Sequence, residues 1–180
     1  MAEPASFPTR RRAVQILHAA RAQTLDLIDL LPKAALTRAG IGGGEWSPKD
    51  LIGHLASWEE YALDALAAWD RGERAPIDEL QFSLSTSRIN RHNVERKATL
   101  SLARVRHDAE RTHAELIAAI EGMSDARWRG PVTERGRKPL AMRLGGILGG
   151  PAGYFRHDET HHSSLLGFVE RRGPARPDDG

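Results

Sequence analysis

Apolar residues in this chain recur at steps of three and four over several long segments, and no segment shows the strict alternation of a strand. A helix with one apolar stripe must bury that stripe against another helix. Strong patterns of this kind predict helices over 9–31, 47–70, 101–121 and 151–172, and a weaker one covers 82–97. The sequence therefore predicts an all-α protein, a four-helix bundle with long connectors and extra short helical turns.

The expected helix boundaries follow from proline, glycine and capping residues. Ser47 has the character of an N-cap, Pro48 suits the first helical position, and Asp50 completes a box-like arrangement at the third. The pair Gly149-Gly150 with Pro151 is expected to restart the last helix, and Gly173 to end it. These boundaries predict a flexible N-terminus at 1–8, one bundle domain over 9–172 and a disordered tail at 173–180.

Histidines are concentrated near the C-terminus, where three of the eight in the chain lie within six residues. His157 and His161 are four residues apart, so on a helix they lie one turn apart on the same face. That spacing allows two imidazoles to bind one metal ion. His54, between Leu51 and Leu55 on the second helix, is the candidate for a third ligand, and a hydrogen-bonded core histidine is the alternative interpretation.

Other side chains near these histidines are candidates to line a pocket or to support the ligands: Asp50, Trp58, Tyr154, His162 and Ser164. Asp50 precedes His54 by one turn and is expected to accept a hydrogen bond from its second nitrogen, although capping competes for the same carboxylate. Tyr154 and Ser164 share the helical stripe of the histidine pair. In the alternative interpretation His162 is the buried residue, and the pair faces solvent.

Composition excludes several classes of function. The chain has no cysteine, which rules out disulfides, thiolate metal sites and a cysteine nucleophile. Lysine and arginine number 26 against 24 acidic residues, a net charge of +2 that does not by itself indicate a nucleic-acid partner. No apolar run reaches the roughly 18 residues of a membrane span, and no signal peptide is evident. We therefore expect a cytoplasmic protein with no nucleic-acid or membrane partner.

Two motifs carry a resemblance to a known family. Trp46-Ser47-x-x-Asp50-x-x-x-His54-Leu55 opens a helix, and His157-x-x-x-His161 follows about a hundred residues later. Together they resemble the DinB/YfiT-like superfamily over about residues 10–171. Members of that superfamily are four-helix bundles in which one histidine of the second helix and two of the fourth bind a divalent metal. Matched by position, this ligand set falls on His54, His157 and His161.

The resemblance also implies a function. It suggests a metal-dependent transferase of a small thiol, or a hydrolase, acting on a small electrophilic molecule. Zinc or nickel is the expected metal, although imidazole also suits iron and copper. A low-molecular-weight thiol would be a cosubstrate, because the chain has no thiol of its own. A small-molecule substrate and a homodimer are the expected partners.

A second resemblance leaves an alternative open. The segment from His113 to Asp125, His-Ala-Glu-Leu-Ile-Ala-Ala-Ile-Glu-Gly-Met-Ser-Asp, resembles the ClbS/DfsB branch of the same superfamily. In addition, many metal-binding members follow the last histidine motif with His-Arg-Gly-Gln, whereas this chain has His-Ser-Ser-Leu at 162–165. The alternative is a metal-free small-molecule binding or resistance protein that uses the same cavity.

Overall fold

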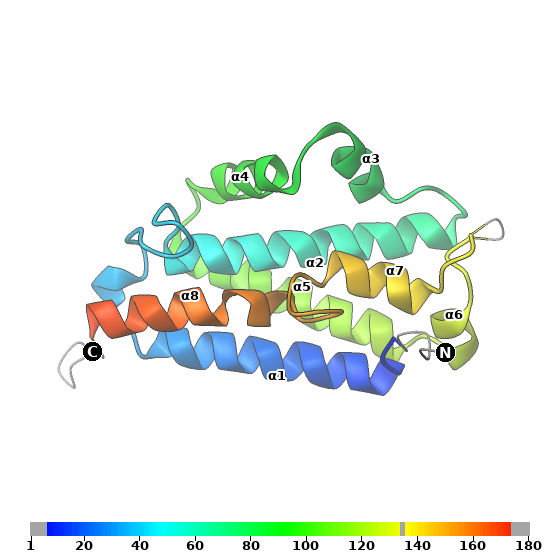
Figure 1. Cartoon of the computed structure of the whole chain (residues 1–180), viewed down its shortest axis with the longest axis horizontal. Helices are drawn as coiled ribbons and strands as arrows, with labels where there is room; N and C mark the ends of the chain where they lie inside the picture. Colours follow the sequence, from blue (N-terminus) through cyan, green and yellow to red (C-terminus); the bar gives the residue numbers. More distant parts are fainter. Residues whose placement is uncertain (1–6, 134–135, 174–180) are drawn as a thin grey trace.

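The computed structural model describes residues 7–133 and 136–173, and the regular elements of this part of the chain are all helices (Figure 1). The four long helices are α1 (Arg10–Asp29), α2 (Pro48–Asp70), α5 (Leu102–Glu121) and α8 (His157–Arg172). The shorter ones are η1 (Lys33–Ala35), α3 (Pro76–Ser83), α4 (Thr86–Lys97), α6 (Asp125–Arg129) and α7 (Leu140–Ile147). The predicted all-α class is confirmed. The expected terminal segments fall largely outside the described residues.

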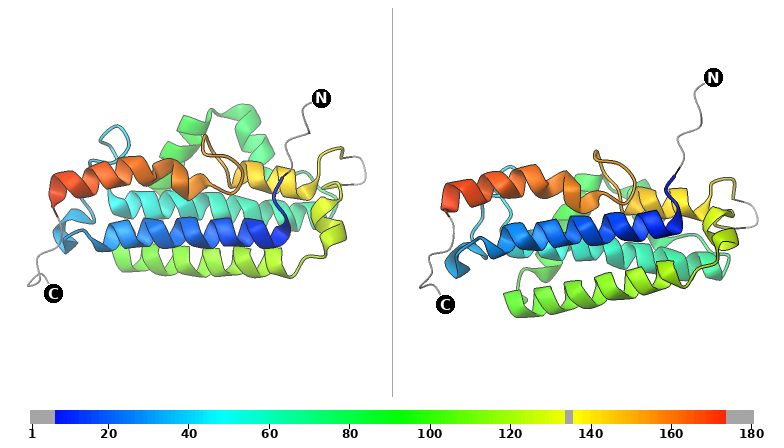
Figure 2. Two further views of the ribbon diagram at one scale, coloured as in Figure 1. Left: turned by 60° about the horizontal axis from the view of Figure 1, so that its bottom comes forward. Right: turned by 90° about the horizontal axis from the view of Figure 1, so that it is seen from below.

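The long helices run side by side along one axis (Figures 1 and 2). Helix α2 packs mainly against α5, and α1 packs mainly against α8. Helices α3 and α4 form an arch over α2, outside the bundle, whereas α7 and α8 lie end to end (Figure 1). The fourth position of the bundle is therefore filled by two helices with a break between them. None of the described helices has the length and apolar character needed to cross a bilayer.

The start of α2 matches the sequence prediction. The Ser47 side-chain oxygen accepts a hydrogen bond from the Asp50 backbone N–H at 3.2 Å. In return, the Asp50 carboxylate accepts from the Ser47 backbone N–H at 2.9 Å, which completes a capping box. Loss of such a cap typically costs about 1 kcal/mol. The box fixes where α2 begins, and hence where His54 lies along it.

The arch differs from the prediction of one helical segment from Phe82 to Lys97. Residues 76–83 form α3, which begins with Pro76 at its first position and buries Ile77 completely. The chain then becomes extended at Leu84, and Ser85 caps α4 by accepting a hydrogen bond from the Arg88 backbone N–H. A serine side chain that bonds to the local backbone favours such a break over a continuous helix.

The start of α8 also differs from the prediction. The chain does not resume a helix at Pro151, because Gly153 has φ +111° and Phe155 has φ +62°. A positive φ costs a phenylalanine roughly 1–3 kcal/mol. Here it turns the Phe155 ring into the core, where the ring stacks on Trp128 with centroids 5.7 Å apart. Burial of such a side chain contributes about 1.5–3 kcal/mol and offsets the strain.

The hydrophobic core is divided in two by a layer of buried polar side chains. Along α1, Leu17 belongs to one apolar cluster and Ile28 to the other, with Arg21 between them. The same division occurs on α2 and α5, whereas the buried apolar residues of α8 all belong to the cluster of Ile28. Four side chains form this layer, and we call them the polar layer: Arg21 of α1, Glu59 of α2, His113 of α5 and Asp158 in the first turn of α8.

Candidate metal centre

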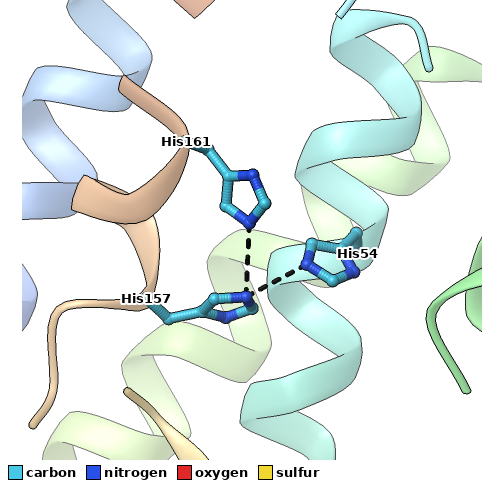
Figure 3. Close-up of side chains that lie close together, drawn as sticks. All are labelled: His54, His157 and His161. Atoms are coloured by element: carbon cyan, nitrogen blue, oxygen red, sulfur yellow. Dashed lines mark hydrogen bonds between the residues drawn. The ribbon is translucent and has the colours of Figure 1, made fainter. Parts of the chain in front are cut away.

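Three histidines from two helices converge at the N-terminal end of α8 (Figure 3). His157 is the first residue of α8, His161 lies one turn later, and His54 projects from α2. The Nε2 atom of His157 lies 3.0 Å from Nε2 of His54 and 3.4 Å from Nε2 of His161. One ring nitrogen from each of the three histidines can be chosen so that all three nitrogens lie within 4.8 Å of one another. We call these three residues the triad.

The spacing of the nitrogens fits a common divalent ion. Zinc binds imidazole nitrogen at about 2.0–2.1 Å, so two nitrogens in a tetrahedral arrangement lie about 3.4 Å apart. The two nitrogen–nitrogen distances at His157 are close to this value. A set of three protein nitrogens also leaves a coordination position open, which is the layout of catalytic rather than structural zinc sites. The residues present therefore fit a divalent metal.

The electrostatic environment keeps the triad neutral. Burial lowers the pKa of His54 well below its ordinary value, and the neighbouring His157 and His161 lower it further. Burial likewise lowers the pKa of His157 to about 3, with a further contribution from His161. The pKa of His161 is also lowered, again mainly by burial. Neutral imidazoles are the form that binds metal ions, because their lone pairs are free.

The buried imidazole of His157 should make the metal-free protein less stable at acidic pH. Its ordinary pKa of 6.5 applies in the unfolded chain, whereas the native value is about 3. Between these values only the unfolded chain binds the proton. The free energy of unfolding is therefore highest above pH 6.5 and falls as the pH is lowered.

At about pH 5, the titration of His157 is expected to lower the free energy of unfolding by about 2 kcal/mol relative to neutral pH. Urea unfolding of chelator-treated protein at neutral pH and at pH 5 measures it. A His157→Leu variant lacks the titrating group. Its free energy of unfolding should therefore fall by about 2 kcal/mol less between the same two pH values. An equal loss in both proteins would contradict the assignment to His157.

A pocket of about 280 Å³ adjoins the triad. It lies between α2, the α3–α4 arch and the break in the fourth helix. Besides the triad, its walls are formed by Trp58, Gln81, Thr86, Asn90, Gly146, Ile147, Gly149, Gly150, Pro151 and Thr160. None of these described lining residues carries a charged side chain. The arch and the helix break thus form most of the pocket.

Two glycines allow the chain between α7 and α8 to lie close to its surroundings. A Cβ atom at Gly150 would come within 2.7 Å of the Thr160 hydroxyl, and one at Gly149 within 2.6 Å of a backbone carbonyl. A larger residue at Gly150 would meet the first turn of α8, and one at Gly149 would meet the Gly145 carbonyl oxygen of α7. The pair is therefore needed for the pocket wall, not for the start of a helix.

The expected supporting residues of α2 have different positions. The indole ring of Trp58 lies 5.9 Å from the His157 ring, and its N–H donates to the Asn90 side-chain oxygen at 3.0 Å. Asp50 does not orient His54, because its carboxylate is engaged in the α2 cap. The Nδ1 atom of His54 is buried and has no hydrogen-bond partner among the described residues. The Asp50 carboxylate thus caps α2 and does not support the His54 imidazole.

Three expected pocket residues of the last helix lie away from the pocket. Tyr154 precedes α8, is exposed, and is not among the residues that line the pocket, so its assignment to the histidine stripe is wrong. Ser164 is exposed on α8 and does not line the pocket. His162 faces α1 instead, with Nε2 2.9 Å from the Thr24 hydroxyl and 3.2 Å from the Ala20 carbonyl oxygen.

The ion pair of Arg21 with Glu59 and Asp158, which lies in the polar layer next to the triad, was not predicted from the sequence. Arg21 Nε donates to Asp158 at 2.8 Å, and its Nη2 lies 3.1 Å from Glu59. Burial opposes the charge of Arg21, but the two carboxylates outweigh it and raise its pKa. Burial would raise the pKa of Asp158, but Arg21 more than reverses this and lowers it. Since Asp158 directly follows His157, this ion pair anchors the first turn of α8 to α1.

A signal for this layer was present in the sequence. Arg21 is in phase with the apolar positions Leu17 and Ile28 of its helix, and Glu59 is in phase with Leu55 and Ala62. A charged residue on an apolar stripe is buried with a partner or not buried at all. The pattern could therefore have marked both residues as candidates for a buried ion pair.

Comparison with known proteins agrees with this architecture. A model of the DinB superfamily matches residues 16–163. No curated protein matches the chain. The fold is similar to that of an uncharacterised protein from Escherichia coli UTI89, with a TM-score of 0.72 and 11% identity, over 96% of this chain and 100% of that one. That likeness shows the fold alone, whereas the family match extends over most of the sequence. The chain therefore belongs to the DinB superfamily.

Proposed function

We propose that this protein binds one divalent metal ion through His54, His157 and His161 and uses it to react a small electrophile with a thiol or with water. The observation that carries the proposal is the convergence of three neutral imidazole nitrogens beside a pocket. A divalent metal in such a site acts as a Lewis acid that makes a thiol or water nucleophilic near neutral pH. Zinc and nickel both suit three imidazole ligands.

The pocket supports a small polar substrate. Its described walls offer hydroxyl and amide groups from Thr86, Thr160, Gln81 and Asn90, together with backbone groups of the loop before α8. These groups can orient a polar molecule by hydrogen bonds, and the positive charge at the pocket would come from the metal ion itself. The Trp58 indole adds an apolar surface against which the molecule can pack. A nucleophilic thiol has to come from a cosubstrate, since the chain has no cysteine.

One observation favours a second candidate, a metal-free small-molecule binding protein. The 3.0 Å between Nε2 of His54 and Nε2 of His157 also suits an N–H···N hydrogen bond between two neutral imidazoles. In that case the triad would be a polar wall of the pocket, and the protein would sequester a molecule without transforming it. Metal content separates the two candidates.

The test begins with protein purified without a histidine tag. We expect about one equivalent of zinc, nickel or iron per chain, and its loss in a His54→Ala, His157→Ala double variant. The loaded protein is then assayed with 1-chloro-2,4-dinitrobenzene plus cysteine or glutathione, and with 4-nitrophenyl acetate without thiol. Turnover that requires the metal supports an enzyme. No metal after incubation with zinc and nickel would overturn the proposal in favour of the metal-free candidate.

A further inference from the structure

The side-chain amide of Asn90, in the wall of the pocket beside the triad, has a fixed orientation. The indole N–H of Trp58 donates a hydrogen bond to Asn90 Oδ1 at 3.0 Å. An indole nitrogen only donates, so the partner atom of the amide has to be its oxygen. The oxygen is therefore held by Trp58, and the NH₂ group of Asn90 remains for another partner.

This NH₂ group is accessible at the pocket wall. Thr86 and Asn90 lie one turn apart on α4 and both line the pocket, so this face of the helix forms part of the wall. Asn90 is half-buried, and its Nδ2 has no hydrogen-bond partner among the described residues. It is not one of the buried unpaired atoms, in contrast to Nδ2 of Asn93, three residues further along.

The other polar side chains of the wall do not offer an equivalent donor. The Thr160 hydroxyl donates to the Arg156 carbonyl oxygen at 3.3 Å, so its lone pairs are what it offers to the pocket. Gln81 and Thr86 are exposed, and within the described chain no side-chain hydrogen bond orients them. A donor that is already oriented loses less conformational freedom when a ligand binds.

The Trp58 ring connects this donor to the triad. One part of the ring lies edge-on to the His157 imidazole, with centroids 5.9 Å apart, and its N–H holds the Asn90 amide. The pocket volume of about 280 Å³ is near the lower end of the range for small-molecule sites. A molecule that reacts at the triad therefore has its far side close to the wall that carries Asn90.

We propose that Asn90 determines substrate specificity, because its Nδ2 donates a hydrogen bond to an acceptor oxygen of the electrophile. The inference rests on the proposed function and narrows its substrate class to small electrophiles that carry a carbonyl, ester or nitro oxygen. A site that presents an oriented donor discriminates against analogues without an acceptor, since the donor then loses its partner. The bond to Trp58 prevents the amide from turning its oxygen to the pocket instead.

Three probes with the same skeleton test this assignment: acetophenone only accepts a hydrogen bond, 1-phenylethanol donates and accepts, and ethylbenzene does neither. Each is titrated calorimetrically into chelator-treated protein, so that the probe oxygen has no metal to bind. Asn90→Asp keeps an acceptor for Trp58 but has no N–H. It should lower the affinity for acetophenone relative to ethylbenzene about tenfold, the usual effect of one hydrogen bond.

The relative affinity for 1-phenylethanol should stay within about twofold in Asn90→Asp, because its hydroxyl can donate to the new carboxylate. In Asn90→Leu, which has a similar shape and no charge, both oxygen-containing probes should lose about tenfold relative to ethylbenzene. Equal changes for all three probes, or no binding of acetophenone to the wild type, would overturn the proposal.

Tyr61→Phe is the control for an indirect effect through α4. It removes the neighbouring hydrogen bond between α2 and α4, from the Tyr61 hydroxyl to Asn93 Oδ1 at 2.7 Å, and neither residue lines the pocket. The relative affinities should match those of the wild type. If Tyr61→Phe weakens acetophenone binding as much as Asn90→Leu, the anchoring of α4 is responsible, and the proposal is overturned.

NMR observes the hydrogen bond directly. The side-chain amide signals of Asn90, identified by their loss in Asn90→Asp, should move further downfield with acetophenone than with ethylbenzene, since both probes carry the same ring. Equal shifts would contradict a hydrogen bond from Nδ2. These measurements need neither bound metal nor turnover, so their failure is distinguishable from failure of the proposed function.

Discussion

Replacing His157 with alanine is expected to weaken zinc binding by at least about 100-fold, since losing even an outer partner of a ligand commonly costs 10–100-fold. His157 is the central member of the triad, because its Nε2 lies within 3.4 Å of both other nitrogens. Its loss leaves His54 and His161 on different helices without the nitrogen that lies between them. Competition with a chromogenic chelator measures the change in affinity.

His162→Ala is the matched control for this experiment. His162 is one residue from His161 on the same helix, but its Nε2 faces Thr24 and Ala20 of α1 rather than the triad. We expect this variant to keep the wild-type affinity for zinc. If His157→Ala binds zinc as tightly as the wild type, or if the control loses the metal equally, the triad is not the metal site.

Replacing Arg21 with methionine is expected to lower the free energy of unfolding by about 3–5 kcal/mol, the usual cost of removing one partner from a buried ion pair. The Arg21, Glu59 and Asp158 side chains are all at most 10% exposed. Without the guanidinium, Glu59 and Asp158 are two buried carboxylates with no positive partner. Urea unfolding near neutral pH measures the loss.

Arg11→Met provides the comparison, because Arg11 is an exposed arginine on the first turn of the same helix. Exposed substitutions of this type usually change stability by less than about 0.5 kcal/mol. A loss below about 1 kcal/mol in Arg21→Met would show that water or other side chains satisfy the two carboxylates. The ion pair would then not be what anchors α8 to α1.

Features that depend on a few neighbouring residues were predictable from the sequence. The α2 cap is such a feature, since Ser47, Pro48 and Asp50 lie within four positions and act on the same backbone groups. The approach of His157 to His161 is another, because a helix brings residues four apart onto one face. The contribution of His54 could be anticipated only through the family motif, as it lies about a hundred residues away.

Features decided by distant packing were not predictable. The glycines and Pro151 before α8 suit a helix start equally well as a loop, and the choice depends on Phe155 entering the core beside Trp128. The buried ion pair is a similar case, because Arg21 and Asp158 are separated by 137 positions. The apolar stripe of α1 could mark Arg21 as a buried charge, but nothing in the sequence identifies Asp158 as its partner. Only their juxtaposition shows that they are buried together.

The polar layer has a consequence for the register of the helices. A long helix that slid by one turn, about 5.4 Å, would move Arg21 or Glu59 against the aliphatic side chains of an apolar cluster. Only one lengthwise alignment pairs the charges of α1, α2 and α8. That alignment also sets the separation between His54 and His157. Substitutions of apolar residues within either cluster can therefore change the packing at one end of the bundle. The spacing of the triad nitrogens then stays the same, because the ion pairs hold the helices in alignment.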